Sequence, residues 1–423
     1  MSARYPVHED LDGDFTLERI WSLTGRPTAY PMPVLESHIA ATARRESIWR
    51  LGQPTGLFTN LGTNDDNVVL HAFETSLLWR PPVAVSTRGL TPTVADRWLT
   101  LATHWIALST ASGDQRFLNA ACKLLGAVWM HYRSSRSEPG WLRFTPRLAI
   151  VAYHVGAASD QLSTQLRNRP AKPTAPDVVA DLELPDGRRG PPSAPPSVVV
   201  LAGAGSAGAT RFLATAASTG LPVTAVCWYA AASPTGQEAR SNYADAWYPP
   251  QSAPLRAADV VPGPVARSTA STWDAVAEVL RRHVPDLVVL LGMPIVPATV
   301  LNLASLGFIN AHNGSLPQYR GMDAPAWALL NDDPIVCTLH LARPAVDRGE
   351  ILACAAVQFA PAGTLRSRVK TTQLNLLLAA TRHVTATGRL PDATAQPEHG
   401  GRQYYRMHPH LKRILDTFAH RNG

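Results

Sequence analysis

Residues 198–228 read VVVLAGAGSAGATRFLATAASTGLPVTAVCW, and the class of fold follows from this stretch. An apolar run at 198–202 ends in glycine, apolar residues recur with helical spacing over 207–219, and a second strand-like run covers 223–228. Farther along, residues 272–283 predict an amphipathic helix and residues 286–291 another apolar strand. Fully apolar strands that alternate with helices indicate a mostly parallel sheet covered on both faces. We therefore predict an α/β domain.

The glycines in this stretch match a nucleotide-binding pattern only in part. Gly203, Gly205 and Gly208 form GxGxxG between a predicted strand and a predicted helix. In dinucleotide-binding folds such glycines let the backbone approach a pyrophosphate, and an acidic residue after the second strand binds the ribose. Here the second strand continues as CWYAAAS, without an acidic residue. We interpret the glycines as a tight turn between strand and helix.

Polar side chains gather farther downstream, where residues 307–321 read GFINAHNGSLPQYRG. Asn310 and His312 lie two residues apart at the end of a short predicted strand, so their side chains leave the same face. His340 ends another predicted strand, and Asp347 lies in the turn before the next one. Amide and imidazole N–H groups can stabilise the oxyanion formed when an amine attacks a formyl carbon. A carboxylate can accept the proton of that amine.

These motifs resemble the catalytic core of the 10-formyltetrahydrofolate-dependent formyltransferase family. The family includes methionyl-tRNA formyltransferase, glycinamide ribonucleotide transformylase, sugar N-formyltransferases and formyltetrahydrofolate deformylase. Its pattern is N-x-H-x-S-L-L-P-x-Y-R-G, then P-x-x-W-A, T-x-H and D-x-G-x-I. The residues of this chain that match are Asn310, His312, Leu316, Pro317, Tyr319, Arg320, Gly321, Pro325, Trp327, Ala328, Thr338, His340, Asp347, Gly349 and Ile351. The resemblance implies a Rossmann-like core over residues 198–388.

The resemblance also implies roles for individual residues. Asn310 and His312 would polarise the formyl group, Asp347 would relay the proton, and His340 would support the site. The family's serine is replaced by glycine at position 314, so Ser315, one place later, is the expected substitute. The formyl donor 10-formyltetrahydrofolate is expected to bind, without any metal, at Leu290, Gly292, Met293, Pro294, Ile295, Val296, Arg343 and Val346.

The rest of the chain has a different pattern. Helical spacing predicts helices at 91–112, 114–135 and 147–168 and a weaker one at 35–51, which makes residues 1–167 a mainly α-helical domain. Its role is open between acceptor binding and contacts in a homo-oligomer. Residues 168–197 are rich in proline and predict a linker, and residues 389–423 form a C-terminal tail that predicts a final strand and helix.

Composition excludes several other classes. The net charge is +7 and the pI about 9.4, but the excess comes from arginines spread along the chain, so we do not expect nucleic acid as a partner. The four cysteines show no CxxC spacing and predict buried free thiols. No apolar run approaches the ~20 residues of a membrane span, and the polar first residues do not resemble a signal peptide. We expect a cytoplasmic protein without membrane contacts.

The resulting functional prediction is an N-formyltransferase that acts on the amine of a small molecule, in specialised metabolism. Three alternatives stay open. A methionyl-tRNA-type enzyme would need a further C-terminal domain, and a deformylase would transfer the formyl group to water. A catalytically inactive binding protein would have lost the asparagine, histidine or aspartate, all of which are present.

Overall fold

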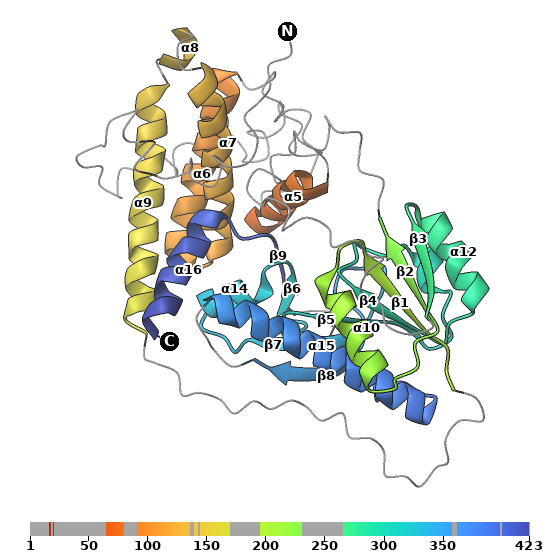
Figure 1. Ribbon diagram of the computed structural model, residues 1–423. Coiled ribbons are helices and arrows are strands. Elements are labelled where there is room, and N and C mark those ends of the chain that lie inside the picture. Colours follow the sequence, from red (N-terminus) through yellow and green to blue (C-terminus); the bar gives the residue numbers. More distant parts are fainter. Residues whose placement is uncertain are drawn as a thin grey trace. The chain divides into compact units, whose positions relative to one another are not determined.

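The computed structural model describes residues 65–79, 91–135, 139–142, 144–169, 195–230, 265–357, 362–397 and 400–422, together with Leu17 and Ile20 (Figure 1). These residues fall into two compact units. The first contains the helices before residue 170 and the C-terminal segment 406–421, and the second contains the strands and helices up to residue 405. The weak helix predicted at 35–51 and most of the proline-rich linker lie outside the described residues.

A seven-stranded sheet forms the centre of the second unit. Its strands are β1 (Val198–Gly203), β2 (Ala225–Tyr229), β3 (Ala266–Ala270), β4 (Leu287–Leu291), β5 (Gly307–His312), β7 (Val336–Leu341) and β8 (Ile351–Ala356), in the order β3-β2-β1-β4-β5-β7-β8. The first five strands are parallel, whereas β7 is antiparallel to β5 and to β8. The mostly parallel α/β sheet predicted from the sequence is therefore confirmed.

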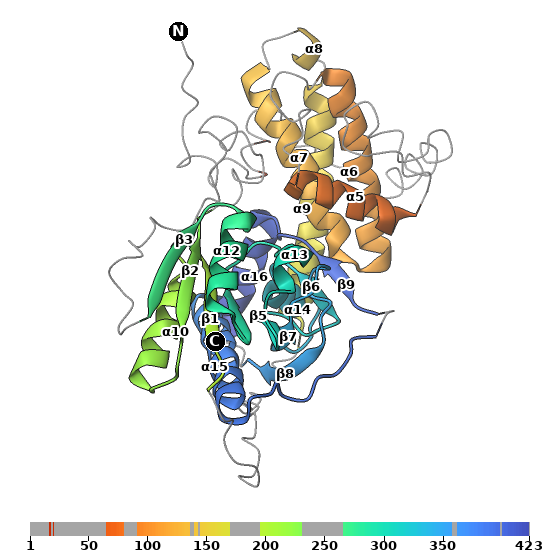
Figure 2. The ribbon, with the colours of Figure 1, turned by 90° about the vertical axis from the view of Figure 1, so that its right-hand side faces the viewer.

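Helices cover both faces of this sheet, as a parallel sheet requires (Figure 2). On one face lie α10 (Ala207–Ser218) and α15 (Ala362–Thr387), and on the other lie α12 (Trp273–His283) and the short α13 (Ala298–Leu301). The face toward α12 and α13 buries alternate strand residues, such as Val199 and Leu201 on β1, against Val276 and Val300. This period of two is what a pleated strand produces.

The glycine loop after β1 has a packing reason for its composition. A Cβ atom on Gly203 would lie 2.4 Å from the carbonyl oxygen of Gly292, in the loop after β4. Gly205 has a φ of +75°, a conformation that side chains disfavour. Ser206 then caps α10, because its hydroxyl accepts the N–H of Ala209 at 3.3 Å. The loop is a tight strand-to-helix turn.

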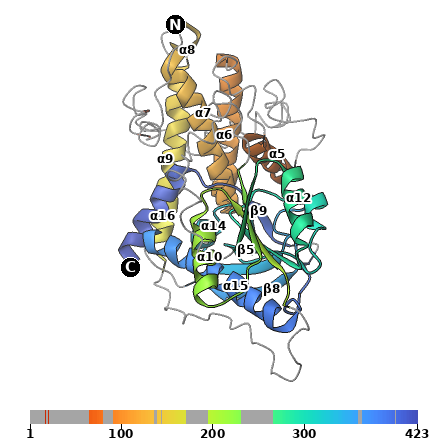
Figure 3. The same ribbon diagram turned by 45° about the vertical axis from the view of Figure 1, so that its right-hand side comes forward.

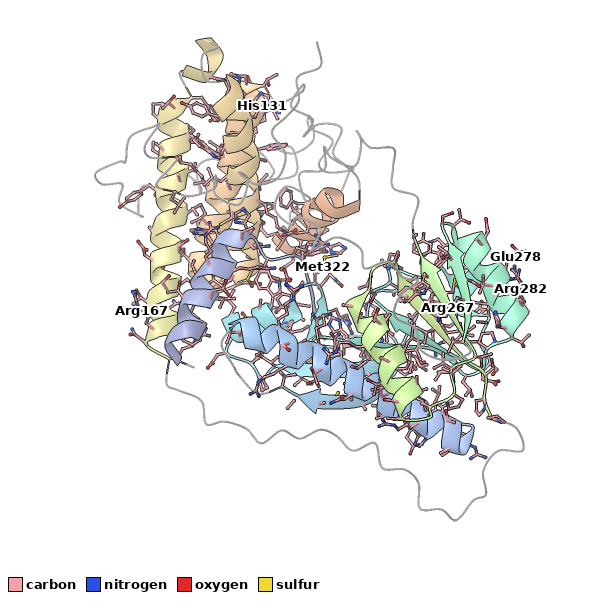
Figure 4. All side chains as sticks on the ribbon, viewed as in Figure 1. His131, Arg167, Arg267, Glu278, Arg282 and Met322 are labelled. Carbon is pink, nitrogen blue, oxygen red and sulfur yellow. The ribbon has the colours of Figure 1, made fainter. Side chains whose placement is uncertain are left out.

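A second, two-stranded sheet joins the catalytic loop to the C-terminal segment. Strand β6 (Tyr319–Gly321) pairs in parallel with β9 (Arg402–Tyr404), and α14 (Ala324–Leu330) follows β6. Met322, labelled in Figure 4, comes directly after β6, and its N–H donates to the Tyr404 carbonyl at 3.0 Å. The predicted final strand is thus part of the core rather than a free tail.

The elements described in the first unit are helices. They are α5 (Asp66–Trp79), α6 (Pro92–Ser112), α7 (Gln115–Ser135), α8 (Pro139–Leu142), α9 (Thr145–Arg167) and the C-terminal α16 (Pro409–Asn422). Helices α6, α7 and α9 match the predicted ones within two residues at each end, whereas the sequence did not predict α5. Helix α16 lies beside α9 (Figure 3), where the Ser159 hydroxyl is 2.8 Å from His410 Nε2.

A buried polar cluster ties the C-terminal segment to these helices. Lys123 Nζ on α7 donates to Glu74 Oε2 on α5. The Asn119 amide donates to Glu74 Oε1 at 3.3 Å and to the Arg406 carbonyl at 3.2 Å, and its oxygen accepts the His408 N–H at 2.6 Å. Burial raises the pKa of Glu74 and lowers that of His408. Asn119 thereby links a buried ion pair to the chain that enters α16.

All four cysteines lie among the described residues, and all are free thiols. Cys122, Cys227 and Cys337 are buried free thiols as predicted, but Cys354 is exposed. Its strand, β8, is at the edge of the sheet, so alternate side chains face away from the core. Among the described residues, no helix has the length and apolarity needed to cross a membrane. The same residues contain no group of three or more His, Cys, Asp or Glu side chains arranged so that they could hold a metal ion.

Candidate active site

The antiparallel pairing of β5 with β7 brings the first predicted residues together. Asn310 is paired directly with His340, and His312 with Thr338. Residues paired across two strands point to the same face, and the Asn310 Nδ2 atom lies 3.1 Å from His340 Nε2. Asn310 and His312, two residues apart, therefore share one face with His340.

Asp347 reaches this cluster from the turn between β7 and β8. Its Oδ2 accepts the N–H of Gly321 at 2.8 Å and lies 3.4 Å from His312 Nδ1. Its Oδ1 lies 3.6 Å from His340 Nε2. The side chains of His312 and Asp347 are 5% and 11% exposed. The structure thus gathers Asn310, His312, His340 and Asp347 into one nearly buried cluster.

Hydrogen bonds to the backbone assign the protons of both imidazoles. His312 Nε2 lies 2.7 Å from the Tyr319 carbonyl and His340 Nδ1 lies 2.8 Å from the Leu341 carbonyl, and because a carbonyl only accepts, both nitrogens carry hydrogen. Burial lowers the pKa of His340 and favours its neutral form. Neutral His340 then accepts one N–H of the Asn310 amide at Nε2. This bond orients Asn310 and uses only one of its two N–H groups.

The loop between β5 and β6 is held by the buried Thr338. Its hydroxyl donates to the Gly314 carbonyl at 2.8 Å and accepts the Leu316 N–H at 3.2 Å. A Cβ atom on Gly314 would lie 2.6 Å from the Tyr319 carbonyl and 2.7 Å from His312 Nε2. In this loop conformation the position has no room for the serine of the family pattern.

Ser315, the expected substitute for that serine, is half-buried in this loop. Its hydroxyl donates to Gln318 Oε1 at 3.2 Å. Its place in the site stays a prediction.

The residues expected to bind the donor lie in two segments. Leu290 and Val296 are buried around the loop after β4, whereas Ile295 is 42% exposed and Gly292 has a φ of +67°. Met293 packs against the core on the α12 side of the sheet, and Pro294 lies in the same loop.

The second segment, with Arg343 and Val346, is the turn that carries Asp347. Arg343 pairs with Glu350 through two hydrogen bonds of 2.9 Å, which lower the pKa of Glu350. Both segments thus present backbone and exposed side chains beside the core, and donor binding there stays a prediction.

Sequence reasoning missed two partners of Asp347. The first is the N–H of Gly321, a backbone group, which the identity of a side chain cannot predict. Gln396, which donates to the Asp347 carbonyl at 2.9 Å, is 49 residues away in the segment interpreted as a tail. Gln396 in turn accepts a hydrogen bond from Arg320, which is 3% exposed. The sequence identified Arg320 only as a residue that matches the family pattern.

Comparison with known proteins gives a family match over the segment that contains these residues. Residues 197–381 match the family model described as formyl transferase. A methionyl-tRNA formyltransferase from Desulfotalea psychrophila is 37% identical over 91 residues, which is 21% of this chain and 28% of the relative. One from Syntrophus aciditrophicus is 33% identical over 117 residues, covering 26% and 38%. The chain thus spans about a third of the length of these curated relatives.

Solved structures of two other kinds of formyltransferase also align. Glycinamide ribonucleotide transformylase 1 from Symbiobacterium toebii aligns over 49% of this chain and 96% of its own, with 20% identity and a TM-score of 0.36. A sugar N-formyltransferase from a Shewanella species aligns over 49% and 76%, with 19% identity and a TM-score of 0.34. The family match lies over the segment that holds the sheet and the polar cluster, so residues 197–381 of this chain are similar to the formyl transferase family.

Proposed function

We propose that this protein transfers a formyl group from 10-formyltetrahydrofolate to the amine of a small molecule. The observation that carries the proposal is the convergence of Asn310, His312 and Asp347 at the end of β5, within a segment of this family. An acceptor nitrogen forms the new C–N bond, the bond between the formyl carbon and the donor nitrogen breaks, and the proton lost by the amine is balanced by a proton gained by the donor nitrogen. The products are an N-formyl amine and tetrahydrofolate.

The residues divide this chemistry between them. Asn310 offers its second N–H to the oxyanion that forms when the amine attacks. His312 is fixed through Nε2 to the Tyr319 carbonyl, so its Nδ1 edge faces Asp347 and the reacting atoms. Asp347 accepts the amine proton directly or through one water. His340 orients the Asn310 amide through their hydrogen bond and does not transfer a proton.

The two predicted donor-binding segments are the proposed site for the pterin ring of the donor. The loop after β4 offers backbone groups at Gly292 and Pro294 beside the exposed, apolar Ile295. Backbone donors and acceptors next to an apolar surface suit a pterin, which carries both kinds of group on a planar ring. When bound, 10-formyltetrahydrofolate would supply the activated formyl group.

The burial of the site favours a small or slender acceptor. The side chains of His312 and Asp347 are 5% and 11% exposed, so only a small part of each is open to an approaching amine. For the helical first unit we propose one of two roles: it shapes the acceptor site, or it forms the contacts of a homo-oligomer. Size-exclusion chromatography with light scattering would measure the oligomeric state.

The test uses the purified full-length protein. It is incubated with 10-formyltetrahydrofolate and pools of primary amines, amino acids and amino sugars, and products are followed by mass spectrometry. Gain of one formyl group by an amine supports the proposal. Free formate as the only product would instead identify a hydrolase, formylation of methionyl-tRNA alone would identify the tRNA-type enzyme, and no turnover of the donor would contradict catalysis.

A further inference from the structure

A buried arginine and a glutamine from the C-terminal segment form a unit behind the catalytic turn. Arg320 on β6 is 3% exposed, and its Nη2 and Nε donate to Gln396 Oε1 at 2.9 and 3.3 Å. Its Nη1 donates to the Gly400 carbonyl at 3.0 Å. Because a guanidinium only donates, it fixes which end of the Gln396 amide faces it. The amide nitrogen of Gln396 must therefore point the other way.

That nitrogen points to the turn that carries the proposed base. Gln396 Nε2 donates to the Asp347 carbonyl at 2.9 Å and to the Gly349 carbonyl at 2.7 Å. The Gln396 amide thus links the carbonyls of Asp347 and Gly349 to the buried guanidinium of Arg320. The turn also has little room to rearrange, because a Cβ atom on Gly349 would lie 1.7 Å from the Leu341 carbonyl.

Asp347 needs such support because of its backbone conformation. Its φ is +52°, in the left-handed region that an L-residue other than glycine adopts at a cost. In that conformation its carboxylate accepts the Gly321 N–H at 2.8 Å and faces His312. If the Asp347 carbonyl loses its donor, the turn can relax toward a conformation without strain, and the carboxylate leaves both partners.

We infer that Gln396 is a positioning residue for catalysis: it holds the Asp347 turn in its left-handed conformation, and buried Arg320 sets the direction of its amide. This inference rests on the proposed role of Asp347. Gln396 does not touch the reacting atoms, so it acts on turnover through Asp347 alone. The segment around Gln396 is then part of the catalytic machinery although it lies after the family match at residues 197–381.

The decisive variant is Gln396→Glu, which has the same shape. The new carboxylate keeps the acceptor for Arg320, so the buried cation stays paired, but both donations to the turn are lost. We expect kcat to fall about 10- to 100-fold, the loss typical of a catalytic group misplaced by about 1 Å. The KM for the formyl donor should stay within about twofold, because the loop after β4 is untouched. Gln165→Glu, on the exposed side of α9, is the matched control and should leave both constants unchanged.

A double-mutant cycle separates positioning from general damage. If Gln396 acts through Asp347, then Gln396→Glu should lower kcat no further in an Asp347→Asn background. Equal losses in both backgrounds would show that Gln396 acts elsewhere and would overturn the inference. An unchanged kcat in the single variant would overturn it as well, while leaving the proposed function intact.

A measurement without turnover keeps the inference testable if the wild-type protein shows no transfer. Hydrogen–deuterium exchange of peptides covering residues 344–350 should be faster in Gln396→Glu than in wild type and in Gln165→Glu. Exchange in β1 and β4 should be the same in all three, which also excludes global unfolding. Unchanged exchange at residues 344–350 would contradict the inference.

Discussion

The Asp347 carboxylate has three polar neighbours that belong to different elements. Its Oδ2 accepts the Gly321 N–H at 2.8 Å and lies 3.4 Å from His312, and its Oδ1 lies 3.6 Å from His340. Replacement by asparagine keeps an oxygen for Gly321 but removes the base. We expect Asp347→Asn to lower kcat by about 10²–10⁴-fold, the usual contribution of a general base. The variant should unfold at the same temperature as the wild type in a thermal melt, and near-wild-type turnover would contradict the proposed mechanism.

Gly314 allows a second test at the scale of one residue. Its hypothetical Cβ lies 2.6 Å from both the Ala324 Cβ and the Tyr319 carbonyl and 2.7 Å from His312 Nε2. Gly314→Ser restores the residue of the family pattern but crowds the bond between His312 and Tyr319. Overpacking of this kind costs about 1–3 kcal/mol of unfolding free energy. We expect that loss in urea-induced unfolding, together with reduced turnover.

The effect of Gly314→Ser should be partly reversed by a second change. Ala324→Gly removes one of the crowding atoms, so the double variant should regain part of the lost stability. A serine variant as stable and active as the wild type would show that the loop adapts freely.

At the scale of elements, a deeply buried ion pair joins α5 to α7. Lys123 and Glu74 are 3% and 2% exposed, and Asn119 links the pair to the C-terminal segment. Lys123→Met leaves the carboxylate without its cation, which typically costs about 3–5 kcal/mol. Replacing both partners by methionine should cost less, because no charge is then buried. Urea-induced unfolding of both variants measures the difference, and equal losses would contradict this account.

Elements with a regular apolar pattern could be predicted from the sequence, whereas an element with a weak pattern could not. Strands β1 and β4 are continuous apolar runs, and helices α6, α7 and α9 have apolar residues at helical spacing, so the sheet class and the helical region could be predicted from them. Helix α5 reads DNVVLHAFETSLLW, with apolar residues on several sides, and its period is weak. At its N-terminus, Asp65 accepts the Asn67 N–H at 2.9 Å.

The site divides in the same way. Asn310, His312, His340 and Asp347 could be predicted because strand ends and motif spacing place them. The groups that support Asp347 could not be predicted. They depend on a left-handed turn and on a hydrogen bond from Gln396, which is 49 residues away in the sequence. Local patterns contain no information about such distant contacts.

For the whole molecule, buried histidines predict how stability depends on pH. Burial lowers the pKa of His410 to about 4 and that of His408 well below its usual value, and nearby Arg413 adds to both effects. His410 donates its backbone N–H to His408 Nδ1 at 3.1 Å, which requires that nitrogen to be unprotonated. The unfolded chain therefore binds more protons than the folded protein below the ordinary histidine pKa of about 6.5.

The sign of the effect follows from that difference. Stability from His410 is fully present above pH of about 6.5 and is lost as the pH falls toward 4. Each proton of difference corresponds to a slope of about 1.4 kcal/mol per pH unit. His410→Gln keeps a polar group for Ser159 but cannot titrate. Between pH 7 and pH 5 its unfolding free energy should therefore fall by about 1–2 kcal/mol less than that of the wild type. Urea-induced unfolding followed by circular dichroism at both pH values measures this, with Gln165→Glu as a control that should keep the wild-type slope. Parallel pH profiles for wild type and His410→Gln would show that His410 does not carry the acid sensitivity.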